Sequence, residues 1–284
     1  MNISGSYLRA LKCLGALTSR QSVRRHVPNW ISQVRAINDM AEKAVKSTVS
    51  NWPKAILFGD SLTQFSFSAD GCWGAMVTDY LQRKCDVFNR GFSGYNSRWN
   101  KIILPKLVTQ ADAESIAFVT IFLGANDSVD KSLNPQQHVP LEEYKQNLID
   151  MVDYLQSIGV KRNLVILITP PACDEEAWAL DCKLKERPTP PSKVNSITKR
   201  YAEACVEAAQ VCGTEIVDLY TCMMKQEDWK SCLNDGLHLA TRGSLLLFDL
   251  LQPILDKLTS ELPIIYNLWS EVDSENPNAT LDKW

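Results

Sequence analysis

The stretch Ser115–Leu123 reads SIAFVTIFL and is the strongest strand signal in the chain. A polar turn, Gly124-Ala125-Asn126-Asp127, follows it at once. Two further apolar runs, Lys54–Gly59 (KAILFG) and Asn163–Thr169 (NLVILIT), have a similar character. Runs that are apolar throughout, rather than alternating, are typical of strands covered on both faces of a sheet. We therefore expect these three segments to be buried strands of a β-sheet.

Segments with helical spacing separate these strands and are expected to cover the sheet. Weaker strand signals at Asp86–Asn89 and Thr214–Asp218 bring the expected number of strands to five. Apolar residues recur at helical spacing in Cys72–Lys84, Asn96–Val108 with an interruption at Pro105, Leu141–Ile158, Ser192–Val211 and Thr241–Leu258. Strands that alternate with helices predict βαβ units and a mostly parallel sheet. With right-handed crossovers, the predicted fold is a three-layer α/β/α sandwich.

The chain divides into three parts by composition. Residues 51–262 are expected to form one domain that begins near Trp52-Pro53, and residues 263–284 are expected to form a C-terminal tail. Within the domain, Pro170–Ser192 contains five prolines and is predicted to leave the sheet as a long loop after the fourth strand. Loops of that length are often functional.

Residues 1–50 form a basic N-terminal extension. Six basic side chains precede the first acidic residue, Asp39: Arg9, Lys12, Arg20, Arg24, Arg25 and Arg35. An arginine-rich, serine-containing and acid-poor segment fits a mitochondrial transit peptide, and it fits a disordered or loosely helical extension equally well. Because the segment lacks a continuous apolar core, we do not expect a secretory signal.

Composition excludes several other classes of function. The 284 residues carry a net charge of −3, which does not favour nucleic acid or an anionic membrane as a partner. The longest near-apolar run is too short to span a bilayer. Nine cysteines without a C-x-x-C motif, and three histidines in all, do not provide a zinc site. We therefore expect thiols in a reducing, intracellular compartment.

Ser61 is the candidate nucleophile. It lies in Gly59-Asp60-Ser61-Leu62, directly after the first strand. A serine hydroxyl becomes a nucleophile only when a base removes its proton. An isolated Gly-Asp-Ser sequence more often marks a helix cap, so Ser61 needs support from other segments.

His238 is the candidate base, with Asp235 three residues before it. In a turn, the Asp235 carboxylate would accept the Nδ1–H and leave Nε2 free to face the serine. The other two histidines are poorer candidates, because His26 lies in the basic extension and His138 lacks a carboxylate three residues earlier. A polar loop before a helix is the alternative interpretation of this segment.

Donors for an oxyanion are expected from Gly91 and Asn126, together with the Ser61 N–H. Gly91 in Asn89-Arg90-Gly91 presents its N–H without a side chain, and Asn126 offers an amide. Both residue types are also common in turns. In an open parallel sheet, ligands bind beyond the carboxyl ends of the strands. Ser61, Gly91 and Asn126 follow three successive strands, so we expect them on one edge.

The four segments resemble the blocks of the SGNH, or GDSL, hydrolase family. Here the blocks read GDSL, NRGFSG, GAND and DGLH, and the resemblance covers roughly Ala55 to Leu258. Longer stretches such as ILFGDSLTQFSF, VPLEEYKQNL and VILITPP are similar to isoamyl acetate-hydrolysing esterase homologues within the family. The resemblance implies a flavodoxin-like sheet of five strands. It also implies a Ser61–His238–Asp235 triad, with Gly91 and Asn126 as oxyanion donors and no metal or organic cofactor.

The resulting expectation is a serine esterase that acts on a small, short-chain ester and water. Two alternatives stay open: an esterase, lipase or thioesterase for longer acyl chains or lipids, and an inactive binding protein with the same fold. The oligomeric state stays open as well, a homo-oligomer included. A glycan at the sequon Asn126-Asp127-Ser128 would block the site, which argues against secretion and favours the cytoplasm or the mitochondrion.

Overall fold

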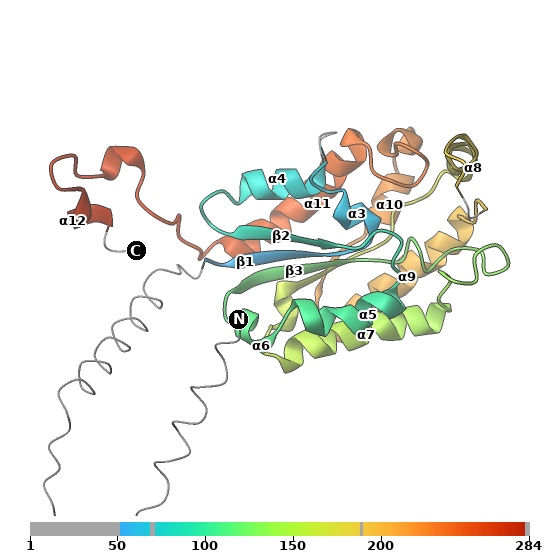
Figure 1. Ribbon diagram of the computed structural model, residues 1–284, viewed down its shortest axis with the longest axis horizontal. Coiled ribbons are helices and arrows are strands. Elements are labelled where there is room, and N and C mark those ends of the chain that lie inside the picture. Colours follow the sequence, from blue (N-terminus) through green and yellow to red (C-terminus); the bar gives the residue numbers. More distant parts are fainter. Residues whose placement is uncertain (1–51, 69–71, 188–189, 282–284) are drawn as a thin grey trace, which may run out of the picture. The chain divides into compact units, whose positions relative to one another are not determined.

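A computed structural model describes residues 52–68, 72–187 and 190–281 of the chain (Figure 1). The basic extension, residues 1–50, lies outside the described residues, so the two interpretations of it stay predictions. Residues 51–284 form a compact unit of their own.

Five parallel strands form one sheet in the order β2-β1-β3-β4-β5. Their bounds are β1 Lys54–Gly59, β2 Asp86–Gly91, β3 Ile116–Phe122, β4 Val165–Ile168 and β5 Glu215–Val217. Because the chain crosses from β2 past β1 to β3, the order reverses at β1, where open α/β sheets bind ligands. The expected α/β/α sandwich with a five-stranded parallel sheet is confirmed.

Helices cover both faces of the sheet (Figure 1). One face carries α4 (Trp73–Tyr80) and α11 (Thr241–Thr259), and the other carries α5 (Ser97–Leu107), α7 (Leu141–Ser157) and α9 (Asn195–Cys212). The shorter elements are α3 Ser61–Gln64, α6 Gln110–Ala113, η2 Arg162–Leu164, α8 Glu175–Leu184, α10 Leu219–Met224, η3 Trp229–Cys232 and, after α11, η4 Trp269–Glu271 and α12 Pro277–Leu281.

The strands are apolar throughout because both of their faces are buried. In β1, Leu57 packs with the α4/α11 layer and Phe58 with the α5/α7/α9 layer, and neither is exposed to solvent. Successive side chains of a strand point to opposite faces, so each strand contributes to two cores. Together these two cores hold the edge of the sheet at which β1, β2 and β3 end.

Two helices differ from the expectation. Pro105 was predicted to interrupt its helix, but α5 continues to Leu107. Proline lacks the N–H that would bond to the carbonyl four residues earlier, and the helix ends two residues after it. The loop predicted at 170–192 contains the helix α8, which begins at the cap Asp174, whose carboxylate accepts from the Ala177 N–H at 3.4 Å.

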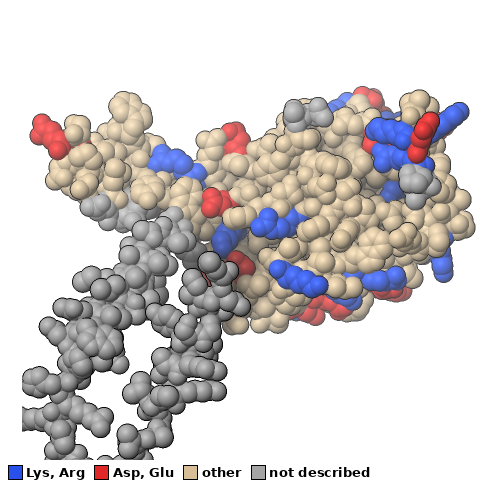
Figure 2. All heavy atoms as spheres, viewed as in Figure 1, with Lys and Arg blue, Asp and Glu red and all other residues tan. Residues whose placement is uncertain are grey.

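The surface carries charged side chains of both signs (Figure 2), and the described cysteines are free thiols. Figure 2 shows basic and acidic side chains interspersed on the visible face, with both signs gathered near the end of the molecule where α8 lies. Eight cysteines are described, and each is a free thiol. Within the described ranges, no helix has the length and apolar composition to cross a bilayer, and no cluster of His, Cys, Asp and Glu suits a metal ion.

Candidate active site

The loop after β1 places Ser61 at the start of α3. Asp60 is the helix cap, and its Oδ1 accepts a hydrogen bond from the Leu62 N–H at 2.9 Å. Gly59 makes the sharp turn possible, because a Cβ there would lie 2.3 Å from Thr63 Oγ1 and 2.5 Å from the Phe122 carbonyl oxygen. The capped turn holds Ser61 in place, and only 5% of the residue is exposed.

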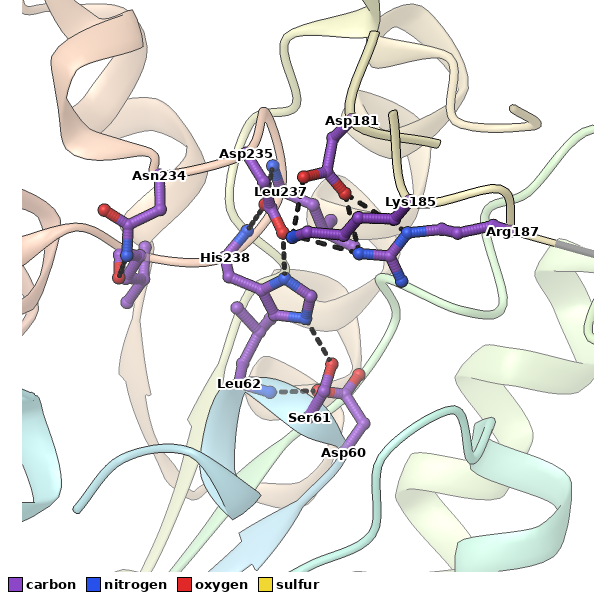
Figure 3. A network of polar contacts seen from close by, with 11 residues as sticks. Asp60, Ser61, Leu62, Asp181, Lys185, Arg187, Asn234, Asp235, Leu237 and His238 are labelled. Carbon is purple, nitrogen blue, oxygen red and sulfur yellow. Dashed lines mark hydrogen bonds and ion pairs between the residues drawn. The ribbon is translucent and has the colours of Figure 1, made fainter. Parts of the chain in front are cut away.

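His238 reaches Ser61 from the loop before α11 (Figure 3). Its Nε2 lies 3.0 Å from Ser61 Oγ, and its Nδ1 lies 2.7 Å from Asp235 Oδ2. The other oxygen of Asp235 accepts from the backbone N–H groups of Leu237 at 3.0 Å and His238 at 2.8 Å. The carboxylate therefore holds both the ring and the backbone of the turn, as three residues of spacing allow.

These contacts also keep Asp235 ionised. Burial alone would raise its pKa, but the hydrogen bond and charge of His238 and the two backbone N–H groups outweigh that effect and lower the pKa to about 2. An ionised Asp235 accepts the Nδ1–H, which leaves Nε2 with a lone pair that faces the serine hydroxyl. The arrangement can therefore accept the Ser61 proton.

Two aromatic rings pack edge-on against His238. The Phe65 ring lies 5.8 Å from the imidazole, and the Trp178 ring of α8 lies 6.1 Å from it. The Arg187 guanidinium covers Trp178 at 4.7 Å and pairs with Asp181 at 2.7 Å. The segment after β4 thus forms one wall of the site, a role that its proline content did not reveal.

Asn126 lies after β3, and its amide is fixed at both ends. Its Nδ2 donates to the Tyr95 carbonyl oxygen at 2.9 Å, and its Oδ1 accepts from Lys193 Nζ at 3.2 Å. One hydrogen of the Nδ2 group is left over after the bond to Tyr95. Asn126 lines a small cavity of about 120 Å³ together with Ser61 and His238.

Gly91 does not reach this cavity. Its N–H donates to the Asn89 Oδ1 at 2.9 Å, at the end of β2. A Cβ at Gly91 would lie 2.0 Å from the Gln64 backbone nitrogen, so the position needs glycine because β2 packs closely against α3. The expectation that the Gly91 N–H faces the site therefore does not match the geometry.

Gly94, three residues later, does line the small cavity. It has a φ of 81°, and no hydrogen bond to another described residue occupies its N–H. Gly91, the expected donor, is the glycine nearest the predicted strand end, and Gly94 was not predicted as a donor. The signal that could have found it is the second glycine of NRGFSG, because a turn that follows the strand lies closer to Asn126 than the strand itself.

A larger cavity of about 760 Å³ also borders Ser61. Its walls combine apolar and charged side chains, among them Leu62, Phe65, Trp73, Asp181, Lys185 and Arg187. Ser61 and His238 line both cavities. A substrate carbonyl at Ser61 could therefore extend one substituent into each space.

Sequence comparison finds close relatives over nearly their full length. The chain is 50% identical over 244 residues to the isoamyl acetate-hydrolyzing esterase 1 homolog of Mus musculus, and the aligned region covers 85% of this chain and 97% of that protein. The Homo sapiens homolog is 49% identical over 231 residues, 81% of this chain and 92% of that protein.

Solved structures share the fold. The lipase/acylhydrolase from Enterococcus faecalis is 25% identical, with a TM-score of 0.56 over 75% of this chain and 98% of that chain. An acetylxylan esterase from Geobacillus stearothermophilus is 23% identical, with a TM-score of 0.56 over 72% of this chain and 94% of that chain.

The family model for GDSL-like lipases and acylhydrolases matches residues 57–246, which include Ser61, Asn126, Asp235 and His238. That match and the identity to the curated esterases agree. The chain therefore belongs to the GDSL-like lipase/acylhydrolase family and is a carboxylic ester hydrolase.

Proposed function

We propose that the protein hydrolyses short-chain carboxylic esters, acetate esters foremost, through an acyl-enzyme on Ser61. The observation that carries the proposal is the continuous pair of contacts from Asp235 through His238 to Ser61, at 2.7 and 3.0 Å. Both distances lie within hydrogen-bond reach, which a nucleophile and its base require.

In the first half-reaction, Ser61 Oγ attacks the ester carbonyl carbon while its proton passes to His238 Nε2. The Ser61 N–H, the Asn126 Nδ2 and the N–H of Gly94, in place of Gly91, donate to the oxygen that becomes negative. The bond from carbon to the alkoxy oxygen then breaks, and His238 returns the proton to the leaving alcohol. Asp235 stabilises the imidazolium between these two transfers.

In the second half-reaction, a water molecule attacks the acyl-enzyme. His238 takes one proton from the water, the same donors hold the oxyanion, and the bond between carbon and Ser61 Oγ breaks. His238 then returns the proton to Ser61. The products are one carboxylic acid and the free serine, so no metal or organic cofactor enters the balance.

Two observations support a short acyl group. The close relatives are named for isoamyl acetate, and the cavity that holds the candidate oxyanion donors is the smaller one, at about 120 Å³. A short acyl group would fit there, with the alcohol in the larger space. The size and the apolar residues of the 760 Å³ cavity favour the alternative of a longer or lipid acyl chain.

Turnover of nitrophenyl acetate and nitrophenyl decanoate by the wild type and Ser61→Ala tests both parts. We expect faster turnover of acetate, and loss of about four orders of magnitude or more in Ser61→Ala. Ser68→Ala is the control, because Ser68 lines the larger cavity together with Ser61, but its hydroxyl is hydrogen-bonded to the Cys72 thiol. Faster turnover of decanoate would reject the proposed preference for short acyl chains. An active Ser61→Ala would reject the mechanism and revive the binding-protein alternative.

A further inference from the structure

Lys193 enters the interior from the end of the segment that carries α8. Only 7% of the residue is exposed, which is unusual for a lysine. Its backbone is held in place, because Lys193 forms an antiparallel bridge with Val129 and the Ser192 carbonyl accepts from the Asp130 N–H at 2.8 Å. The side chain therefore points inward from a fixed position on the rim of the sheet.

The Lys193 ammonium reaches the turn that carries Asn126. Nζ donates to the Ala125 carbonyl oxygen and to Asn126 Oδ1, the latter at 3.2 Å. An ammonium can only donate and the Tyr95 carbonyl can only accept, so these two neighbours determine which end of the Asn126 amide is oxygen. The amide has one orientation, with Nδ2 on the side of Tyr95.

The same ammonium lies among buried carboxylates, which suggests a purely structural alternative. Asp60 and Asp127 are fully buried, and Oδ2 of each has no hydrogen-bond partner among the described residues. Burial lowers the pKa of Lys193 and raises the pKa of Asp60, while the opposite charge of each partly offsets the effect on the other. Lys193 could therefore act only as a counter-charge.

We propose that Lys193 is a positioning residue that holds the Asn126 amide in the orientation in which Nδ2 can donate to the oxyanion. The inference rests on the proposed function, because it requires Asn126 to act as an oxyanion donor. Without Lys193, the amide keeps the contact to Tyr95 but loses the contact that fixes its oxygen. A donor that is not fixed in advance contributes less in the transition state, with little effect on substrate binding.

Lys193→Met in the full chain tests the inference, because it removes the ammonium and keeps an unbranched side chain that is one atom shorter. We expect kcat for nitrophenyl acetate to fall about 10- to 100-fold, with KM changed less than about threefold. Asn126→Ala should lower kcat about 100- to 1000-fold. If Lys193 acts through Asn126, the double variant should be no more than about threefold slower than Asn126→Ala alone.

Lys199→Met is the matched control, because Lys199 is an exposed lysine of α9 whose only described ion pair is with Glu203 at 3.9 Å. Its kcat should equal that of the wild type. The structural alternative is tested by comparing Asp60→Asn with the double variant Asp60→Asn/Lys193→Met. In Asp60→Asn the side chain still accepts from the Leu62 N–H, but the buried charge at position 60 is removed. If Lys193→Met alone does not fold, the effect of losing Lys193 is measured in the Asp60→Asn background instead.

We expect kcat to fall at least about tenfold when Lys193→Met is added to Asp60→Asn. The inference is overturned if that addition leaves kcat unchanged, or if the effects of Lys193→Met and Asn126→Ala multiply. Failure of the proposed function has a different signature. In that case Asn126→Ala itself would keep the turnover of the wild type, whatever Lys193→Met does.

Discussion

Replacement of Gly236 by alanine should disrupt the contact between α8 and the turn that carries Asp235 and His238. Gly236 lies between Asp235 and His238 with a φ of 90°, and its carbonyl accepts from the Asp174 N–H at 2.8 Å. A Cβ there would lie 2.4 Å from the Trp178 backbone nitrogen and 2.5 Å from the Asp174 carbonyl oxygen. Both atoms belong to backbone, so no side-chain rotation can relieve the clash.

The expected loss of stability has two parts. A side chain at positive φ costs about 1–2 kcal/mol, and displacement of packed backbone costs about 1–3 kcal/mol more. Gly236→Ala should therefore lower the free energy of unfolding by about 2–5 kcal/mol. Gly213→Ala isolates the first part, because Gly213 ends α9 with a φ of 67° and no atom lies within 4 Å of its added Cβ.

Urea unfolding of the wild type and both variants measures these free energies, and nitrophenyl acetate turnover measures the consequence for the site. Gly236→Ala should also lower kcat at least about tenfold, because a shifted turn moves His238 relative to Ser61. Gly213→Ala should leave kcat unchanged. Equal free energies of unfolding for the two variants, or full activity in Gly236→Ala, would refute the packing argument.

Further predictions concern the residues around His238. Asp235→Asn should lower kcat by about three to four orders of magnitude, because an amide no longer selects the Nδ1–H tautomer; a loss under tenfold would contradict this. The lowered pKa of Asp235 in the folded protein, about 2, should stabilise the wild type above about pH 4. That contribution to the free energy of unfolding, about 2 kcal/mol, is lost as the pH falls through 2. Urea unfolding at each pH should show this loss in the wild type and not in Asp235→Asn. Arg187→Met should cost about 1–2 kcal/mol of stability through the lost contacts with Trp178 and Asp181, with kcat within tenfold of the wild type; a hundredfold loss of kcat would instead make Arg187 part of the catalytic machinery.

Local pattern predicted the sheet well. β1 has the predicted bounds, and the apolar runs at β3 and β4 lie at the centre of the sheet. Each of these runs is buried on both faces, and this burial requires apolar residues at every position, which makes the signal visible in sequence. The reversal of strand order at β1 then explains why Ser61 and Asn126, chosen separately, line one cavity.

Long-range contacts were harder to predict. The helix α8 is short and lies among prolines, and its contact with His238 joins segments about 60 residues apart. The burial of Lys193 contradicts the usual exposure of lysine and depends on carboxylates from two other loops. Gly91 was chosen for its lack of a side chain, but the structure uses that property for packing against Gln64. Sequence alone does not distinguish these uses of glycine.

The most direct test of the central claim, that His238 activates Ser61 as the nucleophile, is labelling of the wild-type protein with a fluorophosphonate. Mass spectrometry of the digested protein then identifies the modified residue. We expect a single adduct on Ser61, with loss of esterase activity in proportion to labelling, and no adduct in Ser61→Ala or after substitution of His238 by alanine. An adduct on another serine, or an unlabelled Ser61 in an enzyme that still hydrolyses nitrophenyl acetate, would contradict the account.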